Sequence, residues 1–289
     1  MQEKMLQVKI DGKEVTYREG TRYLDAAKEF QKDADSKIVL ASVNGKLKEL
    51  TKKIKDQDQI VFLTIKDKNG FMTYRRSMIL LMLKAIYSVG GFELVDRVGI
   101  HYSVGNGFYV TVKGQKKVEN SFLEQVEKTM HEMVEKKLPI TKTSVSTDDA
   151  IDLFHRLGME DKEKLFHYRI ASKVNIYDLA GFKDYFYGYM VPDTGYLDRF
   201  VLIPYDEGFV LQMPNRIQPE LVPEFRADAK LFQVQKESLK WGEMMNIRTV
   251  GDLNERIVSE SVHDLMLVQE ALQEKKISEI ASMIAAQPE

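Results

Sequence analysis

Residues 6–17, LQVKIDGKEVTY, decide the fold of the first part of the chain. From Leu6 to Ile10 apolar residues alternate with polar ones, as in a strand that buries one face. Asp11-Gly12 follows, a dipeptide that favours a tight turn between antiparallel strands. The stretch therefore predicts a β-hairpin.

The residues after this hairpin complete a small domain. A helix is predicted over 21–30, a second pair of strands over 38–50 with a turn at Asn44-Gly45, and an apolar strand over 59–65. The order strand, strand, helix, strand, strand, strand is typical of a mixed sheet that wraps over one helix. We expect a β-grasp domain over residues 1–66.

The composition indicates a soluble globular protein of more than one domain. The chain has 289 residues, of which 44% are hydrophobic and 30% charged, and the net charge is −2. It has no cysteine, which excludes disulfides and thiolate chemistry. The first residues are charged where a signal peptide needs an apolar core, so we expect a cytoplasmic location.

Residues 75–87, RRSMILLMLKAIY, contain the longest apolar run of the middle region. The run from Met78 to Leu83 ends at Lys84, whereas a membrane-spanning helix needs roughly 20 apolar residues. A core helix is expected here, and no membrane partner.

A second α+β domain is predicted over 70–225. It comes after a polar turn at 66–70 and contains a hairpin around Gly105-Asn106-Gly107 and helices over 121–139 and 147–158. Segments rich in strand-forming residues lie at 166–181 and 182–214. Residues 226–289 are predicted as amphipathic helices that need a partner surface, and oligomerisation through them stays open.

Two basic stretches bear on nucleic-acid binding, KLKELTKKIK at 46–55 and KGQKK at 113–117. Both lack interleaved aromatic residues, so we interpret them as solvated faces.

The first domain resembles the TGS domain, a ubiquitin-like module at the front of threonyl-tRNA synthetases and in some GTPases. The resemblance rests on the DGK hairpin, Gly20-Thr21 before the helix and the stretch LASVNGKLKEL. The second domain resembles the second additional domain of threonyl-tRNA synthetase, on RRSMILLMLKAIY, on NGFY at 106–109, on the helix LEQVEKTMHEMVEKK and on DYFYGYMVP. That domain belongs to a threonyl/alanyl editing family, which hydrolyses mischarged aminoacyl-tRNA.

The resemblance implies a fold of TGS domain, editing-like α+β domain and helical carboxy-terminal extension. The family carries H-x-x-x-H on its first helix and C-x-G-P-H on a later strand. The histidines of the first motif correspond to Arg76 and Leu80, the cysteine to Phe186 and the last histidine to Met190. None of these four can hold zinc or act as a base at neutral pH. The five histidines form no close pair in sequence: His101, His131, His155, His167 and His263. We therefore predict no catalytic residue, no metal and no cofactor.

Two interpretations of this altered site stay open. In the preferred one apolar side chains fill it, and Arg76 points outward or pairs with an acid. In the other a cleft persists, in which aromatic rings stack a base or nucleoside and cations hold an anion. The candidate ligand-binding residues are Arg75, Arg76, Lys183, Tyr185, Tyr187 and Tyr189.

The tail resembles the connector of bacterial proteins in which such domains precede a uridine kinase-type nucleoside kinase. That resemblance implies a parent protein that phosphorylates uridine or a related nucleoside with ATP and Mg, and a kinase domain of the same polypeptide as the partner of residues 226–289. The phosphate-binding G-x-x-x-x-G-K-[ST] loop is absent from the 289 residues. We therefore expect a non-catalytic regulatory region that binds a nucleoside, nucleotide or RNA. The alternatives are an RNA- or tRNA-binding module and an active editing hydrolase.

Overall fold

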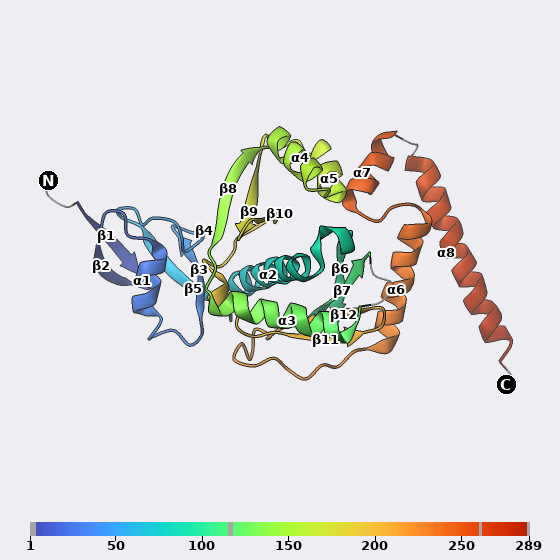
Figure 1. The fold of residues 1–289 in the computed structure, drawn as a ribbon, viewed down its shortest axis with the longest axis horizontal. Coiled ribbons are helices and arrows are strands. Elements are labelled where there is room, and N and C mark those ends of the chain that lie inside the picture. Colours follow the sequence, from blue (N-terminus) through green and yellow to red (C-terminus); the bar gives the residue numbers. More distant parts are fainter. Residues whose placement is uncertain (1–3, 115–117, 260–261, 288–289) are drawn as a thin grey trace. The chain divides into compact units, whose positions relative to one another are not determined.

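The computed structural model describes residues 4–114, 118–259 and 262–287, and Figure 1 shows its helices and strands. Three residues of the basic stretch 113–117, namely 115–117, lie outside the described residues. The chain divides into two compact units. The first comprises Met1–Thr143 and Asn175–Phe232, and the second comprises Ser144–Val174 and Gln233–Glu289.

A five-stranded mixed sheet opens the first unit. Its elements are β1 (Met5–Ile10), β2 (Lys13–Arg18), α1 (Tyr23–Phe30), β3 (Ile38–Val43), β4 (Lys46–Lys48) and β5 (Gln59–Thr64). The strand order is β2-β1-β5-β3-β4, with β1 parallel to β5 and every other neighbouring pair antiparallel. This is the predicted β-grasp arrangement.

Local chemistry accounts for this sheet. Asn44 and Gly45 both have positive φ angles, 51° and 75°, as the two central residues of a tight hairpin turn require. Leu6, Val8 and Ile10 are buried on the face of the sheet that packs with α1 residues such as Tyr23. The alternation in sequence and the turn chemistry therefore specify the same structure.

The apolar run 78–83 lies in the long helix α2 (Lys68–Leu94), which has a kink at Gly91. All six residues of the run are buried except Ile79, which is half-buried. The prediction of a polar turn over 66–70 is wrong at its end, because residues 68–70 already form the first turn of α2. Lys68 and Asn69 are exposed, whereas Gly70 is buried, and a Cβ atom built on it would meet Thr64 of β5 and Val39 of β3.

The following elements come after α2 and belong to the first unit, except that β8 and β9 each extend into the second. They are β6 (Arg97–Val104), β7 (Gly107–Lys113), α3 (Asn120–Glu135), β8 (Ile140–Ser146), β9 (Lys173–Leu179), β10 (Phe182–Tyr185), the 3-10 turn η1 (Thr194–Tyr196), β11 (Val201–Tyr205) and β12 (Gly208–Gln212). One sheet has the order β11-β12-β7-β6 and another the order β10-β9-β8. Helix α3 packs against α2 and β11 and ends at Glu135, before Pro139.

Helices make up most of the second unit: α4 (Thr147–Arg156), α5 (Glu160–His167), α6 (Ala229–Met244) from Gln233 onward, α7 (Val250–Ser259) and α8 (Val262–Ala285). The helix α5 packs against α4 and α7, and Lys164 of α5 lies 3.3 Å from Asp252 and 3.0 Å from Glu255 of α7. Within the described part of the chain, no helix has the length and apolar character needed to cross a membrane.

Candidate functional site

The two segments that resemble the editing motifs lie against each other. Residues 186–191 come after β10 and run along α2. Arg76 Nη1 of α2 donates a hydrogen bond of 3.3 Å to the carbonyl oxygen of Tyr189. One residue further on, Ser77 Oγ accepts a 2.9 Å hydrogen bond from Val191 N and lies 3.3 Å from Met190 Sδ. These contacts fix the second segment on the first turns of α2.

The guanidinium of Arg76 packs directly on Gly188. This glycine has a φ of 132°, and a Cβ atom built on it would lie 2.4 Å from Arg76 Cζ. Any larger residue at position 188 would have to displace the guanidinium. Burial lowers the pKa of Arg76, but an arginine side chain keeps its charge in proteins. A cation therefore fills the space next to the carbonyl of Tyr189.

The other three positions of the resemblance carry apolar side chains. Leu80 is fully buried on α2 and Met190 is 2% exposed, while Phe186 is half-buried after β10. Leucine and phenylalanine have no lone pair to offer a metal or a proton, and a thioether is a weak acceptor. Among the described residues, no group of three or more histidine, aspartate or glutamate side chains lies close enough to hold a metal ion.

A buried polar cluster lies next to Arg76, and the sequence did not indicate it. The carboxylate of Glu49, which comes directly after β4, accepts hydrogen bonds at Oε1 from Lys142 Nζ at 3.0 Å and from Met190 N at 3.2 Å. The hydroxyl of Tyr177 lies 2.6 Å from both Glu49 Oε1 and the carbonyl oxygen of Gly188. We call Glu49, Lys142 and Tyr177 the Glu49 cluster. It joins the β-grasp domain to the region that carries the altered motifs.

The Glu49 cluster is shielded from water and its charges are paired. The side chain of Glu49 is 6% exposed and that of Lys142 is 17% exposed. The Lys142 ammonium also lies 5.0 Å from the ring centre of Tyr177 and 5.3 Å from that of Tyr189, within cation–π distance. Burial and the neighbouring Glu49 carboxylate raise the pKa of Tyr177 well above its usual value, so the phenol stays protonated.

The six candidate ligand-binding residues do not gather at one point. Tyr189 is half-buried beside Arg76 and Lys142, whereas the side chain of Tyr187 is 83% exposed. Lys183 is exposed on β10, and Tyr185 is half-buried at the end of that strand. Arg75 faces a separate cavity.

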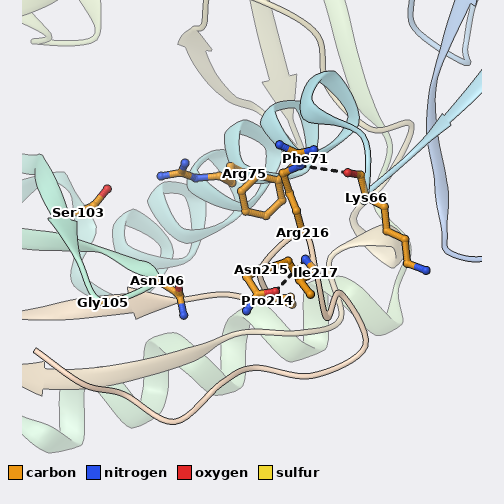
Figure 2. Close-up of a pocket in the computed structure, with 10 residues that line it drawn as sticks. All are labelled: Lys66, Phe71, Arg75, Ser103, Gly105, Asn106, Pro214, Asn215, Arg216 and Ile217. Atoms are coloured by element: carbon orange, nitrogen blue, oxygen red, sulfur yellow. Dashed lines mark hydrogen bonds between the residues drawn. The ribbon is translucent and has the colours of Figure 1, made fainter.

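This cavity has a volume of about 510 Å³ and lies within the first unit (Figure 2). Three segments line it: the end of the β-grasp domain with the start of α2, the β6–β7 hairpin, and the chain after β12. The lining residues are Lys66, Phe71, Arg75, Ser103, Gly105, Asn106, Pro214, Asn215, Arg216 and Ile217. Only Arg75 among them was a sequence candidate. The hairpin contributes Ser103, Gly105 and Asn106, of which only Asn106 belongs to the NGFY stretch at 106–109.

Comparison with known proteins gives one domain model and a set of relatives. Residues 10–64 match the TGS domain. The threonine–tRNA ligase of Thermotoga petrophila is 30% identical over 201 residues, which are 68% of this chain and 30% of the relative. The threonine–tRNA ligase of Marinobacter nauticus is 28% identical over 195 residues, 66% of this chain and 30% of the relative. That of Carboxydothermus hydrogenoformans is 28% identical over 206 residues, 69% of this chain and 31% of the relative. The chain thus spans about 30% of the length of the curated relatives it matches.

These findings correct one prediction. They give a TGS domain and similarity to the first region of threonine–tRNA ligases, and nothing in them points to a uridine kinase or any other nucleoside kinase. The predicted kinase parent is wrong, and with it the interpretation of residues 226–289 as a connector to a kinase domain. Amphipathic spacing in those residues indicates helices with an apolar face but carries no information about a neighbouring domain.

The fold class inferred from the sequence is confirmed. The chain consists of a ubiquitin-like TGS domain of β-grasp topology, an α+β region similar to the amino-terminal region of threonyl-tRNA synthetases, and a helical extension.

Proposed function

We propose that this chain is an RNA-binding module that binds tRNA and leaves aminoacyl ester bonds intact. The relatives are named threonine–tRNA ligases, and this name identifies tRNA as the RNA on which they act. The similarity covers both the TGS domain and part of the region after it. It therefore favours the binding alternative over a regulatory domain of a nucleoside kinase.

One observation carries the second half of the proposal: the guanidinium of Arg76 occupies the space over Gly188. Ester hydrolysis needs a group that takes a proton from water, or a metal that lowers the pKa of water. An arginine that stays protonated does neither. The adjacent Glu49 carboxylate accepts hydrogen bonds from Lys142 and Met190 N, so it is already engaged within the protein.

Exposed lysines of the β-grasp domain provide a surface for phosphates. Lys46, Lys52, Lys53 and Lys55 are all exposed on β4 and the chain after it. Lysines that neutralise phosphates release counterions. The logarithm of the binding affinity therefore falls linearly with the logarithm of the salt concentration. Lysines of a merely solvated face would give no such dependence. The two interpretations of the stretch 46–55 therefore differ in a measurable way.

A filter-binding series with deacylated tRNA tests the proposal. The wild-type chain is expected to bind, with an affinity that falls steeply between about 50 mM and about 200 mM salt. The double variant K52Q/K53Q is expected to bind more weakly and to reduce the slope of log affinity against log salt by about 2, or about 1 for each lost phosphate contact.

The matched control is K230Q/K275Q, which removes the same charge from two exposed lysines of α6 and α8. Its affinity and slope should equal those of the wild-type chain. If the wild-type chain does not bind tRNA at the lower salt concentration, the proposed function is wrong. If both double variants weaken binding equally, the stretch 46–55 has no special role.

A further inference from the structure

The cavity near Arg75 has the charge of an anion site. Three of its ten lining residues are cationic, Lys66, Arg75 and Arg216, and none is acidic. Lys66 Nζ forms an ion pair of 2.8 Å with Asp35, and both side chains are well exposed to water. Arg216 Nε donates a 3.0 Å hydrogen bond to the carbonyl oxygen of Lys66, which holds this arginine at the cavity. Its terminal nitrogens have no hydrogen-bond partner among the described residues.

The third cation of the cavity, Arg75, lies near two aromatic rings. Its guanidinium lies 4.2 Å from the ring centre of Phe108 and 5.5 Å from that of Phe71. The side chain is half-buried, and it has no hydrogen-bond or ion-pair partner among the residues that the structure describes. A guanidinium that lies over a ring keeps its N–H donors along its edge, in the fork geometry that matches two oxygens of a phosphate.

The rest of the cavity wall combines polar and apolar groups. Asn215 Oδ1 accepts hydrogen bonds from the backbone N–H groups of Ile217 and Gln218, so its amide nitrogen remains as a donor. Figure 2 shows Asn106 on the β6–β7 hairpin, on the opposite side of the cavity from Lys66. Phe71 and Ile217 add apolar surface, and the side chain of Ile217 is 87% exposed.

We propose that this cavity binds the phosphate of a nucleotide through Arg75 and Arg216, with the attached base against Phe71 and Ile217. The volume of about 510 Å³ lies within the range of small-ligand sites, roughly 300–1,000 Å³. Cations with aromatic and amide groups suit a phosphate next to an unstacked base. This inference rests on the proposed function where the phosphate belongs to RNA, although a free nucleotide offers the same chemistry.

Two binding measurements on the full chain separate these sources. The first titrates AMP by calorimetry, with adenosine and inorganic phosphate in parallel. The second measures tRNA by filter binding. For whichever ligand binds, R75Q and R216Q are each expected to reduce affinity about tenfold or more, because each loses charge-assisted hydrogen bonds to the phosphate. R75K, which keeps the charge but loses the fork, should fall between R75Q and the wild-type chain.

The matched control is R226Q, an exposed arginine outside the cavity that pairs with Glu224. It should alter affinity less than twofold. Thermal melting of each variant identifies any loss of folding, and R216Q keeps the test valid if R75Q unfolds. Loss of AMP binding in the cavity variants supports a free nucleotide, and loss of tRNA binding alone supports RNA.

The cavity proposal and the proposed function can fail separately. Unchanged tRNA affinity in R75Q and R216Q, together with no binding of AMP, would overturn the cavity proposal and leave salt-dependent RNA binding intact. Absence of tRNA binding by the wild-type chain would overturn the proposed function, while AMP titration would still decide whether the cavity is a phosphate site.

Discussion

Replacing Glu49 by alanine is expected to lower the free energy of unfolding of the first unit by about 3–5 kcal/mol. The substitution leaves the Lys142 ammonium buried without its carboxylate and removes the acceptor of the Met190 N–H group. Both partners are shielded from water, so solvent cannot replace the lost interactions well. Urea denaturation monitored by circular dichroism and by fluorescence measures the loss.

Two further variants show whether the charge pair is responsible. Glu49→Gln keeps the size and one acceptor oxygen, so it should cost less than Glu49→Ala. In the E49A/K142M background the unpaired cation is gone, and part of the stability should return. A decrease of less than about 1 kcal/mol in the free energy of unfolding of Glu49→Ala would match the contribution of an exposed ion pair. Such a result would contradict a buried, paired cluster.

Gly107→Ala is the second large effect that we expect, a loss of about 1–3 kcal/mol from overpacking. A Cβ atom at Gly107 would lie 2.4 Å from the carbonyl oxygen of Leu211 and 2.6 Å from Val210 Cγ1. Strand β7 pairs with β12 next to this point, with Phe108 opposite Leu211, so the backbone oxygen cannot move without breaking the ladder. Thermal and urea unfolding of the variant measure the effect.

The control for Gly107→Ala is Asn106→Ala at the adjacent turn position, which is exposed. Its effect on stability should lie within about 0.5 kcal/mol, as for most exposed sites. If Gly107→Ala is equally neutral, the close approach of β7 and β12 does not constrain this position.

The β-grasp domain could be predicted from the sequence because its signals are local. The alternation of Leu6, Val8 and Ile10 and the turn at Asn44-Gly45 specify the strands and their register within a few residues. The start of α2 was predicted less accurately, because the helix begins at Lys68 within the expected turn. Lys68 and Asn69 are polar and exposed, so hydrophobic periodicity does not mark the start of the helix.

The site could be predicted only in part, for a physical reason. The resemblance to the editing family matched Arg76 and Met190 to two of its motif positions, and the structure brings their segments together. Glu49 lies in a lysine-rich stretch that suggests a solvated face, yet its partners Lys142 and Tyr177 come from 93 and 128 residues away. No local pattern reports such a contact. The same holds for the cavity, to which three distant segments contribute.

We propose that the chain binds tRNA and that Arg76, packed on Gly188, cannot activate water. The most direct test monitors mischarged aminoacyl-tRNA, labelled at its 3′ end, in one reaction with the purified chain. Native gel electrophoresis gives the bound fraction, and acid gel electrophoresis gives the fraction that is still acylated. We predict a bound complex whose ester decays at the rate of tRNA in buffer alone. Ester loss that accelerates in proportion to chain concentration would contradict the account, whether or not it persists in Arg76→Ala.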